Sequence, residues 1–246
     1  MKYNKTHKIK NNFKKTKIFK DNIILASNCT KNTIFANKTS NIINHKFQNN
    51  NSINISVIIT AKMNFKNKTY HQLTDNAKKK FNKQFKYFNI KKPYYINFID
   101  FSKKNNINKA LNSIKNSDII WVVGGDTFYL WYHLKKNNID KIICDRIKKN
   151  NVLYIGCCAG AIIAGETINP AYIARFFKKS NKYKLNNTYK KKFWYKNNNV
   201  STLKLKKNVD FLPHCNSKTT KKLQIYKNLN KLYCLPEYKI YTKKYK

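Results

Sequence analysis

Short apolar runs alternate with amphipathic stretches along most of the chain. The runs are rich in β-branched residues, which favours strands, and the amphipathic stretches repeat apolar residues with a helical period. Strands that alternate with helices predict βαβ units and a mostly parallel sheet. We expect strands at 22–27, 53–60, 93–101, 118–123, 152–155 and 209–212, and two short final strands at 232–235 and 239–241. We expect helices at 69–87, 107–114, 127–136, 140–149 and 218–229.

Three segments lack such a pattern. Residues 1–20 are basic with little apolar content, so we expect a solvated or disordered extension. Residues 28–50 are polar and rich in Asn, and the simplest interpretation is a long loop. Residues 175–207 are rich in Lys and Asn and are interpreted as a long excursion from the core. We expect residues 21–246 to form a single α/β domain, because a chain of 246 residues that is 41% hydrophobic can bury one large core.

The chain is strongly basic, with 52 Lys and Arg residues against 10 Asp and Glu residues and a formal net charge of +42. This charge suits a protein that binds nucleic acid or another anionic surface, and that function is one alternative. However, the only arginines are Arg146 and Arg175, whereas phosphate and guanine contacts favour arginine. The lysines are spread along the whole chain among many Asn, Ile, Tyr and Phe residues, a composition that AT-rich codons produce. We therefore expect polyanion binding to be incidental.

The cysteines do not form a recognisable metal site or disulfide framework. None of them makes a Cys-x-x-Cys pair, and no Cys/His cluster has zinc-ligand spacing, so we expect no metal and no cofactor. The vicinal pair Cys157-Cys158 is a poor structural disulfide, and a reduced, cytoplasmic setting is expected. No apolar segment of signal-peptide or transmembrane length is present, so we expect no membrane association. The six cysteines are Cys29, Cys144, Cys157, Cys158, Cys215 and Cys234.

One stretch, Tyr154–Gly165, has the form of a nucleophile elbow. An apolar strand meets a Gly-x-Cys-x-Gly turn around Cys158, and an Ala/Ile-rich helical stretch follows. In such an elbow, glycines leave room for a sharp turn that pushes the nucleophile clear of the backbone. The N-terminus of the following helix favours a thiolate. The alternative is a plain Gly/Ala-rich turn whose cysteines are small core residues.

A cysteine nucleophile needs a base and an oxyanion hole. Of the five histidines, His214 directly follows a predicted strand end, which is where a base that faces the elbow would lie. An oxyanion hole needs two backbone amides, and these would come from Ala159 and from Gly124 or Gly125. The alternatives are a loop histidine with a structural role and a simple strand-to-helix turn at the two glycines.

Four motifs in this order resemble peptidase family S51, the aspartyl dipeptidase (dipeptidase E) and cyanophycinase family. The motifs are Val123–Phe128, Tyr154–Ala161, Pro213-His214 and Leu235-Pro236-Glu237. In the family they correspond to a Gly-Gly-Asn-Thr-Phe-like loop, a Gly-x-Ser-Ala-Gly-Ala elbow, a Pro-His segment and a Leu-Pro-Glu. The resemblance covers roughly residues 20–245. It implies a flavodoxin-like three-layer α/β domain, related to class I glutamine amidotransferases.

The resemblance also implies the function and the roles of individual residues. Cys158 takes the position of the nucleophile and His214 that of the base, and Gly125 and Ala159 supply the oxyanion hole. The expected activity is hydrolysis of peptide or amide bonds in small peptides, with an N-terminal aspartyl residue preferred. Lys221 takes the position of a basic residue that binds the aspartyl carboxylate, although a solvated helix face is the simpler interpretation in so lysine-rich a chain.

Two departures from the family concern charged groups. The family has a third triad member, an aspartate about 15 residues after the nucleophile, but that count reaches Ile173 here. Asn216 is a candidate to orient His214, because alternate residues of an extended segment share a face and Asn orients imidazole in some cysteine hydrolases. Asp126 replaces the family asparagine and adds negative charge, which could oppose an acidic substrate.

The nucleophile itself is a third departure, because the family uses serine at the position of Cys158. A Cys–His pair depends less on a third residue than a Ser–His pair does. Glu166 and Asp210 are weaker candidates to orient the histidine. The departures leave a second alternative, a catalytically degenerate family member, and a third within the enzyme class, a glutaminase-like role.

Overall fold

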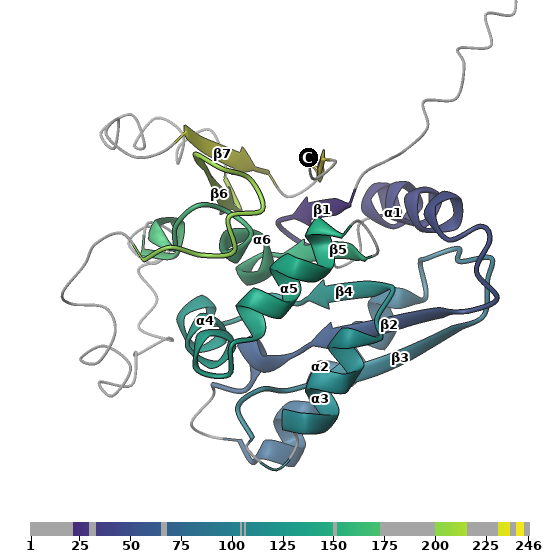
Figure 1. Cartoon of the computed structure of the whole chain (residues 1–246), viewed down its shortest axis with the longest axis horizontal. Helices are drawn as coiled ribbons and strands as arrows, with labels where there is room; N and C mark the ends of the chain where they lie inside the picture. Colours follow the sequence, from purple (N-terminus) through teal and green to yellow (C-terminus); the bar gives the residue numbers. More distant parts are fainter. Residues whose placement is uncertain are drawn as a thin grey trace, which may run out of the picture.

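A six-stranded sheet forms the centre of the structure (Figure 1). This computed structural model describes residues 22–29, 33–64, 68–103, 105, 107–149, 152–172, 200–215, 231–236 and 240–243. The strands are β1 (Ile23–Ala26), β2 (Ile53–Ile58), β3 (Tyr94–Ile99), β4 (Ile119–Val122), β5 (Leu153–Cys157) and β8 (Ile240–Lys243). Their order is β3-β2-β4-β5-β1-β8, and all neighbours are parallel except β1 and β8. The prediction of an α/β fold with a mostly parallel sheet is therefore confirmed.

Helices cover both faces of this sheet, which gives three layers. On one face lie α1 (Thr33–Lys46) and α2 (Tyr70–Phe85). On the other lie α3 (Ile107–Lys115), α4 (Thr127–Lys136), α5 (Ile139–Lys148) and α6 (Ala159–Ile163). Successive strand residues alternate between the two cores, so Ile23 and Leu25 face one core while Ile24 and Ala26 face the other.

The second helix shows how local sequence and burial agree. A capping box starts α2: Thr69 Oγ1 accepts from the Gln72 N–H, and Gln72 Oε1 accepts from the Thr69 N–H. Every fourth residue then faces the core, which is the helical period that predicted this element. These buried residues are Leu73, Ala77, Phe81 and Phe85.

The expectation of a long loop over residues 28–50 is wrong, because this segment contains α1. The helix packs Phe35, Ile42 and Ile43 against the sheet and also buries Thr39. Asn, Ser and Thr have low helix propensity, and several of them interrupt the apolar stripe. Packing against the sheet stabilises a helix that its composition alone disfavours.

A separate two-stranded parallel sheet lies at one end of the central sheet, beside α6 (Figure 1). It consists of β6 (Val209–Pro213) and β7 (Lys231–Leu235). The segment before β6 packs onto the elbow helix, since Leu203 and Leu205 are buried and their N–H groups donate to the carbonyls of Ile163 and Ala164. Three sequence predictions lie outside the described residues: the extension 1–20, the helix 218–229 and residues 175–199 of the excursion.

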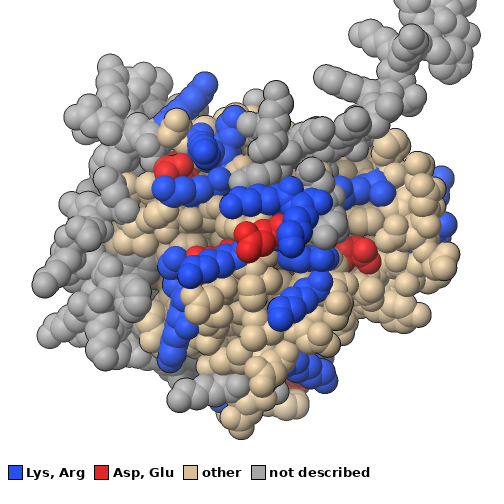
Figure 2. Space-filling view, in the orientation of Figure 1, with Lys and Arg blue, Asp and Glu red and all other residues tan. Residues whose placement is uncertain are grey.

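On the face in Figure 2, basic side chains lie among acidic and uncharged ones. Figure 2 shows Lys and Arg side chains in a broken distribution over one face, with Asp and Glu side chains between them. In the described part of the chain, no helix is both long enough and apolar enough to cross a membrane.

Candidate active site

Cys158 lies at a sharp turn between β5 and α6. Its backbone dihedrals are φ 50° and ψ −103°, a conformation that non-glycine residues rarely adopt. The Cys158 N–H donates to the carbonyl of Ala26 at the end of β1, at 3.0 Å. This bond ties the turn to the neighbouring strand. The strained turn and the strand on one side of it give the geometry of a nucleophile elbow.

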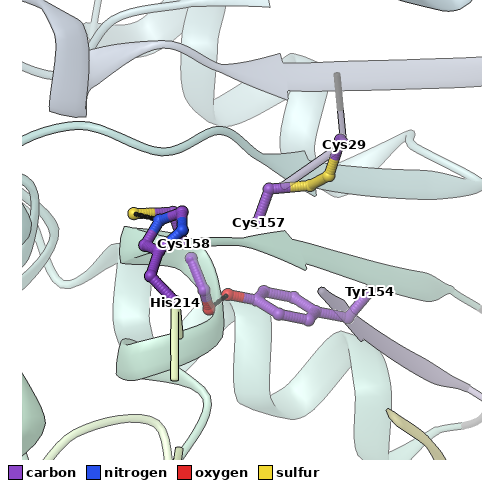
Figure 3. Close-up of a disulfide and its surroundings, with 6 residues drawn as sticks. Cys29, Tyr154, Cys157, Cys158 and His214 are labelled. Atoms are coloured by element: carbon purple, nitrogen blue, oxygen red, sulfur yellow. Dashed lines mark hydrogen bonds between the residues drawn. A yellow bond between two sulfur atoms is a disulfide. The ribbon is translucent and has the colours of Figure 1, made fainter. Parts of the chain in front are cut away.

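Close packing holds this elbow in place. Tyr154 is fully buried, and its hydroxyl donates to the carbonyl of Gly160 at 2.7 Å (Figure 3). Gly160 itself lies against β4, and a Cβ at that position would stand only 2.4 Å from the carbonyl oxygen of Val122. Only glycine permits this approach, so the helix after the nucleophile starts directly over the central strands.

His214 reaches the elbow from the end of β6. Its Nε2 lies 3.3 Å from Cys158 Sγ, although the two residues are 56 positions apart (Figure 3). His214 has a positive φ of 61°. Its N–H donates to Ser27 Oγ at 2.9 Å, and the Ser27 hydroxyl donates to the carbonyl of Leu235. Ser27 therefore joins the central sheet to both strands of the small sheet at the point where the histidine emerges.

The two glycines after β4 lie between the nucleophile and the 3₁₀ turn η1 (Thr60–Lys62). A Cβ on Gly124 would stand 2.7 Å from Cys158 Cβ, and a Cβ on Gly125 would stand 2.1 Å from the carbonyl oxygen of Ala61. Because Gly124 and Gly125 have no side chains, the backbone of this loop can lie close to Cys158. Ala159 is the first residue of α6, so its N–H has no acceptor within the helix.

A cavity of about 400 Å³ opens at these residues. It lies at the carboxyl ends of the parallel strands, where open α/β sheets bind ligands. Cys158, His214 and both glycines line it from one side, and α2 lines it from the other. Sequence reasoning missed two further lining residues, Lys62 and Lys80, because nothing in the local sequence distinguishes them from the many other lysines.

The sequence matches peptidase family S51 over residues 23–231, which is most of the chain. The chain belongs to peptidase family S51. An uncharacterized peptidase of Listeria monocytogenes is 39% identical over 67 residues, which cover 27% of this chain and 31% of that protein. An uncharacterized peptidase of Listeria innocua is 43% identical over 61 residues, which cover 25% of this chain and 28% of that protein. These alignments thus span about a third of each curated relative.

Solved structures with the same fold are also similar to this chain. A protein from Listeria monocytogenes with a provisional peptidase E name superposes with a TM-score of 0.53 at 20% identity, covering 91% of this chain and 98% of the other. A peptidase from an acI-B1 actinobacterium superposes with a TM-score of 0.61 at 16% identity, covering 90% of this chain and 82% of the other. At these identities the similarity shows the three-layer α/β fold and not the chemistry.

Asp126, which stands where the family has asparagine, caps α4. Its Oδ1 accepts from the N–H groups of Phe128 at 2.9 Å and Tyr129 at 3.1 Å, and its Oδ2 accepts from Asn64 Nδ2 at 2.8 Å. Asp126 is buried at the cavity wall. The positive end of the helix and the amide of Asn64 stabilise this carboxylate, which reduces the repulsion that it would exert on an acidic substrate.

The two weaker candidates for the third triad position hold the segment after α6. Glu166 pairs with Lys204 Nζ at 2.8 Å and accepts from the Asn208 N–H at 3.1 Å. Asp210 accepts from the N–H and the hydroxyl of Thr167, at 2.7 and 2.8 Å. These bonds give both carboxylates a structural role.

Three residues singled out in the sequence lie outside the described residues: Asn216, Lys221 and Glu237. Within the described ranges, no group of three or more His, Cys, Asp and Glu side chains could hold a metal ion. His133 is buried in α4, and its ring contacts the rings of Tyr129 and Tyr132. Burial, the largest cause, lowers its pKa to about 4.

The structure pairs Cys29 with Cys157 in a disulfide, so the expectation that all cysteines are reduced is wrong for this pair. Cys157 ends β5 and Cys29 follows β1, and these strands are neighbours in the sheet. Sequence spacing could not find the bond, because 128 residues separate its two cysteines. Cys158, the next residue, is not part of a disulfide, and its thiol points toward His214 instead (Figure 3).

Proposed function

We propose that this member of family S51 hydrolyses peptide or amide bonds with Cys158 as the nucleophile and His214 as the base. The distance of 3.3 Å between His214 Nε2 and Cys158 Sγ carries this proposal. A hydrogen bond between a thiol at an elbow and an imidazole is the arrangement that an activated nucleophile requires. The family membership supports the reaction type.

In the proposed mechanism, His214 takes the proton of the Cys158 thiol and the thiolate attacks the substrate carbonyl. The N–H groups of Gly125 and Ala159 stabilise the oxyanion. The leaving amine takes its proton from His214 as the acyl–enzyme thioester forms. Water then attacks the thioester, His214 accepts the proton of that water, and the acid product leaves as the thiol is restored. Asn216 stays a prediction for the residue that orients His214.

The substrate that we propose is a small peptide with an N-terminal aspartyl residue. A cavity of about 400 Å³ suits a ligand of this size. Lys62 and Lys80 line it, while both oxygens of the lining residue Asp126 accept hydrogen bonds from the protein itself. The two ammonium groups support an acidic substrate. Lys221 stays a prediction for the residue that binds the aspartyl carboxylate.

The test is hydrolysis of Asp-X dipeptides by Cys158→Ala, followed as the release of free amino acid. The variant is expected to lose all measurable activity, because no other group replaces the nucleophile. Cys144→Ala is the matched control, since Cys144 is also a free, half-buried thiol. Full activity of Cys158→Ala would refute the proposal.

Iodoacetamide labelling, read by mass spectrometry, tests the alternative of a degenerate, non-catalytic member. An activated Cys158 should react near neutral pH faster than the other free cysteines. Equal rates would favour the non-catalytic alternative.

The high net charge supports incidental polyanion binding rather than a dedicated nucleic-acid function. The scattered lysines in Figure 2 form no continuous basic surface on that face. Such binding should disappear at moderate salt without sequence preference. A salt titration of binding to mixed-sequence DNA checks this. A sequence-specific complex that persists at moderate salt would favour the nucleic-acid alternative.

A further inference from the structure

Among the described residues, five ionisable side chains line the candidate cavity from different elements. Cys158 comes from the elbow, His214 from the end of β6, Lys62 from η1, Lys80 from α2 and Asp126 from the start of α4. The Asp126 carboxylate already accepts hydrogen bonds from the first turn of α4 and from Asn64. His214 contacts the Cys158 thiol directly. The chemical steps described above use neither lysine, and the two ammonium groups entered only as support for an acidic substrate.

Lys62 is linked to the nucleophile by an unbroken series of close contacts. Gly124 lies against Cys158, and the next residue, Gly125, lies against Ala61. The Asp126 N–H also donates to the carbonyl of Ala61, at 2.8 Å. Lys62 directly follows Ala61 and lines the same cavity as Cys158.

Lys62 is half-buried, and none of the ion pairs among the described residues includes it. Burial lowers the pKa of Lys62, and the neighbouring Lys80 lowers it further, whereas Cys158 raises it. Because electrostatic coupling is reciprocal, the same ammonium favours the thiolate form of Cys158.

We propose that Lys62 is a positioning residue of the active site whose ammonium stabilises the Cys158 thiolate. This inference rests on the proposed function, in which Cys158 is the nucleophile. The proton of the thiol passes to His214, and Lys62 exchanges no proton in the step. A thiolate next to an ammonium is stable at a lower pH, so the cation keeps more of the Cys158 thiol in its nucleophilic form.

The test measures the pH dependence of Cys158 alkylation by iodoacetamide in the full chain. Lys62→Met keeps the length of the side chain and removes its charge, whereas Lys62→Arg keeps the charge. Lys78→Met is the matched control, because Lys78 is exposed on α2 and does not line the cavity. Mass spectrometry of the peptide that contains Cys158 gives the rate, and thermal unfolding shows that each variant is folded.

Lys62→Met is expected to slow alkylation of Cys158 at pH 6 by about 3- to 10-fold, with no change once the thiol is fully ionised at high pH. Lys62→Arg and Lys78→Met are expected to keep the profile of the unsubstituted chain. A Lys62→Met profile that coincides with that of the unsubstituted chain would overturn the inference. So would a rise in KM for Asp-X dipeptides without any change in the thiol profile, since Lys62 would then bind a substrate carboxylate.

The two proposals fail in different ways. If Cys158→Ala abolishes hydrolysis while Lys62→Met leaves the alkylation profile unchanged, only the role of Lys62 is wrong. If the Cys158 thiol of the unsubstituted chain ionises like an ordinary cysteine and Cys158→Ala keeps full activity, the proposed function fails and this inference fails with it.

Discussion

The two halves of the candidate active site are built in different ways. The elbow that carries Cys158 is held by contacts with the central sheet: Gly160 lies against Val122 of β4, the Tyr154 hydroxyl donates to Gly160, and the Cys158 N–H donates to Ala26 of β1. His214 comes from the separate β6–β7 sheet, which Ser27 links to the central sheet. The geometry of the nucleophile therefore depends on the central sheet and its elbow helix, whereas the pairing of nucleophile and base depends on how two sheets dock.

The largest expected effect comes from removing the base. His214→Ala should lower the rate of peptide hydrolysis by about 10²- to 10⁴-fold, the usual contribution of a general base. The elbow itself should stay intact, because its contacts do not involve the imidazole. Kinetics on Asp-X dipeptides measure the loss. His71→Ala, on an exposed histidine of α2, is the control and should have no effect. Activity of His214→Ala within twofold of the unsubstituted chain would contradict the assignment.

The disulfide beside the elbow should matter for stability. Cys29→Ser opens a bond between residues 128 positions apart and should lower the free energy of unfolding by about 2–5 kcal/mol. Urea unfolding measures the change. Dithiothreitol should remove the difference between the two proteins, since it opens the same bond in the unsubstituted chain. A difference that persists in the reductant would mean that Cys29 contributes by packing alone.

Acid should weaken the helix layer that supports the elbow, since α4 packs against α6 and buries His133. The pKa of His133 is lowered to about 4 by burial, so the unfolded chain takes up this proton first. The contribution of neutral, buried His133 to the free energy of unfolding is fully present above pH 6.5. It is lost as the pH falls toward 4, and the loss amounts to at most roughly 3 kcal/mol. Urea unfolding at several pH values should show a smaller loss for His133→Phe than for the control His71→Ala. Equal slopes would contradict this.

The smallest effect distinguishes the two halves most directly. Ser27→Ala and Tyr154→Phe each remove one buried hydroxyl, and each should cost about 1–2 kcal/mol of stability. Only Ser27→Ala should also lower kcat/KM, because Ser27 accepts from the N–H of His214. Unfolding and kinetics of both variants test this. An equal loss of activity in the two would show that the elbow and the base are not held independently.

The sequence by itself determined much of the scaffold. Alternating apolar runs and amphipathic stretches predicted the central strands and the helices α2 to α5, because burial on one face imposes a period that can be read along the chain. It did not predict α1, whose polar composition hides the period. The turn around Cys158 was also readable, since the close approach of Gly160 to Val122 requires glycine at a fixed position.

Only the tertiary structure decided which distant groups meet. The contact between Cys158 and His214, the disulfide between Cys29 and Cys157 and the place of Lys62 all join elements that are far apart in the chain. A lysine among so many lysines, or a cysteine with no partner nearby in the sequence, carries no local signal. Their roles follow from the order of the strands in the sheet, because that order brings the strand ends around one cavity.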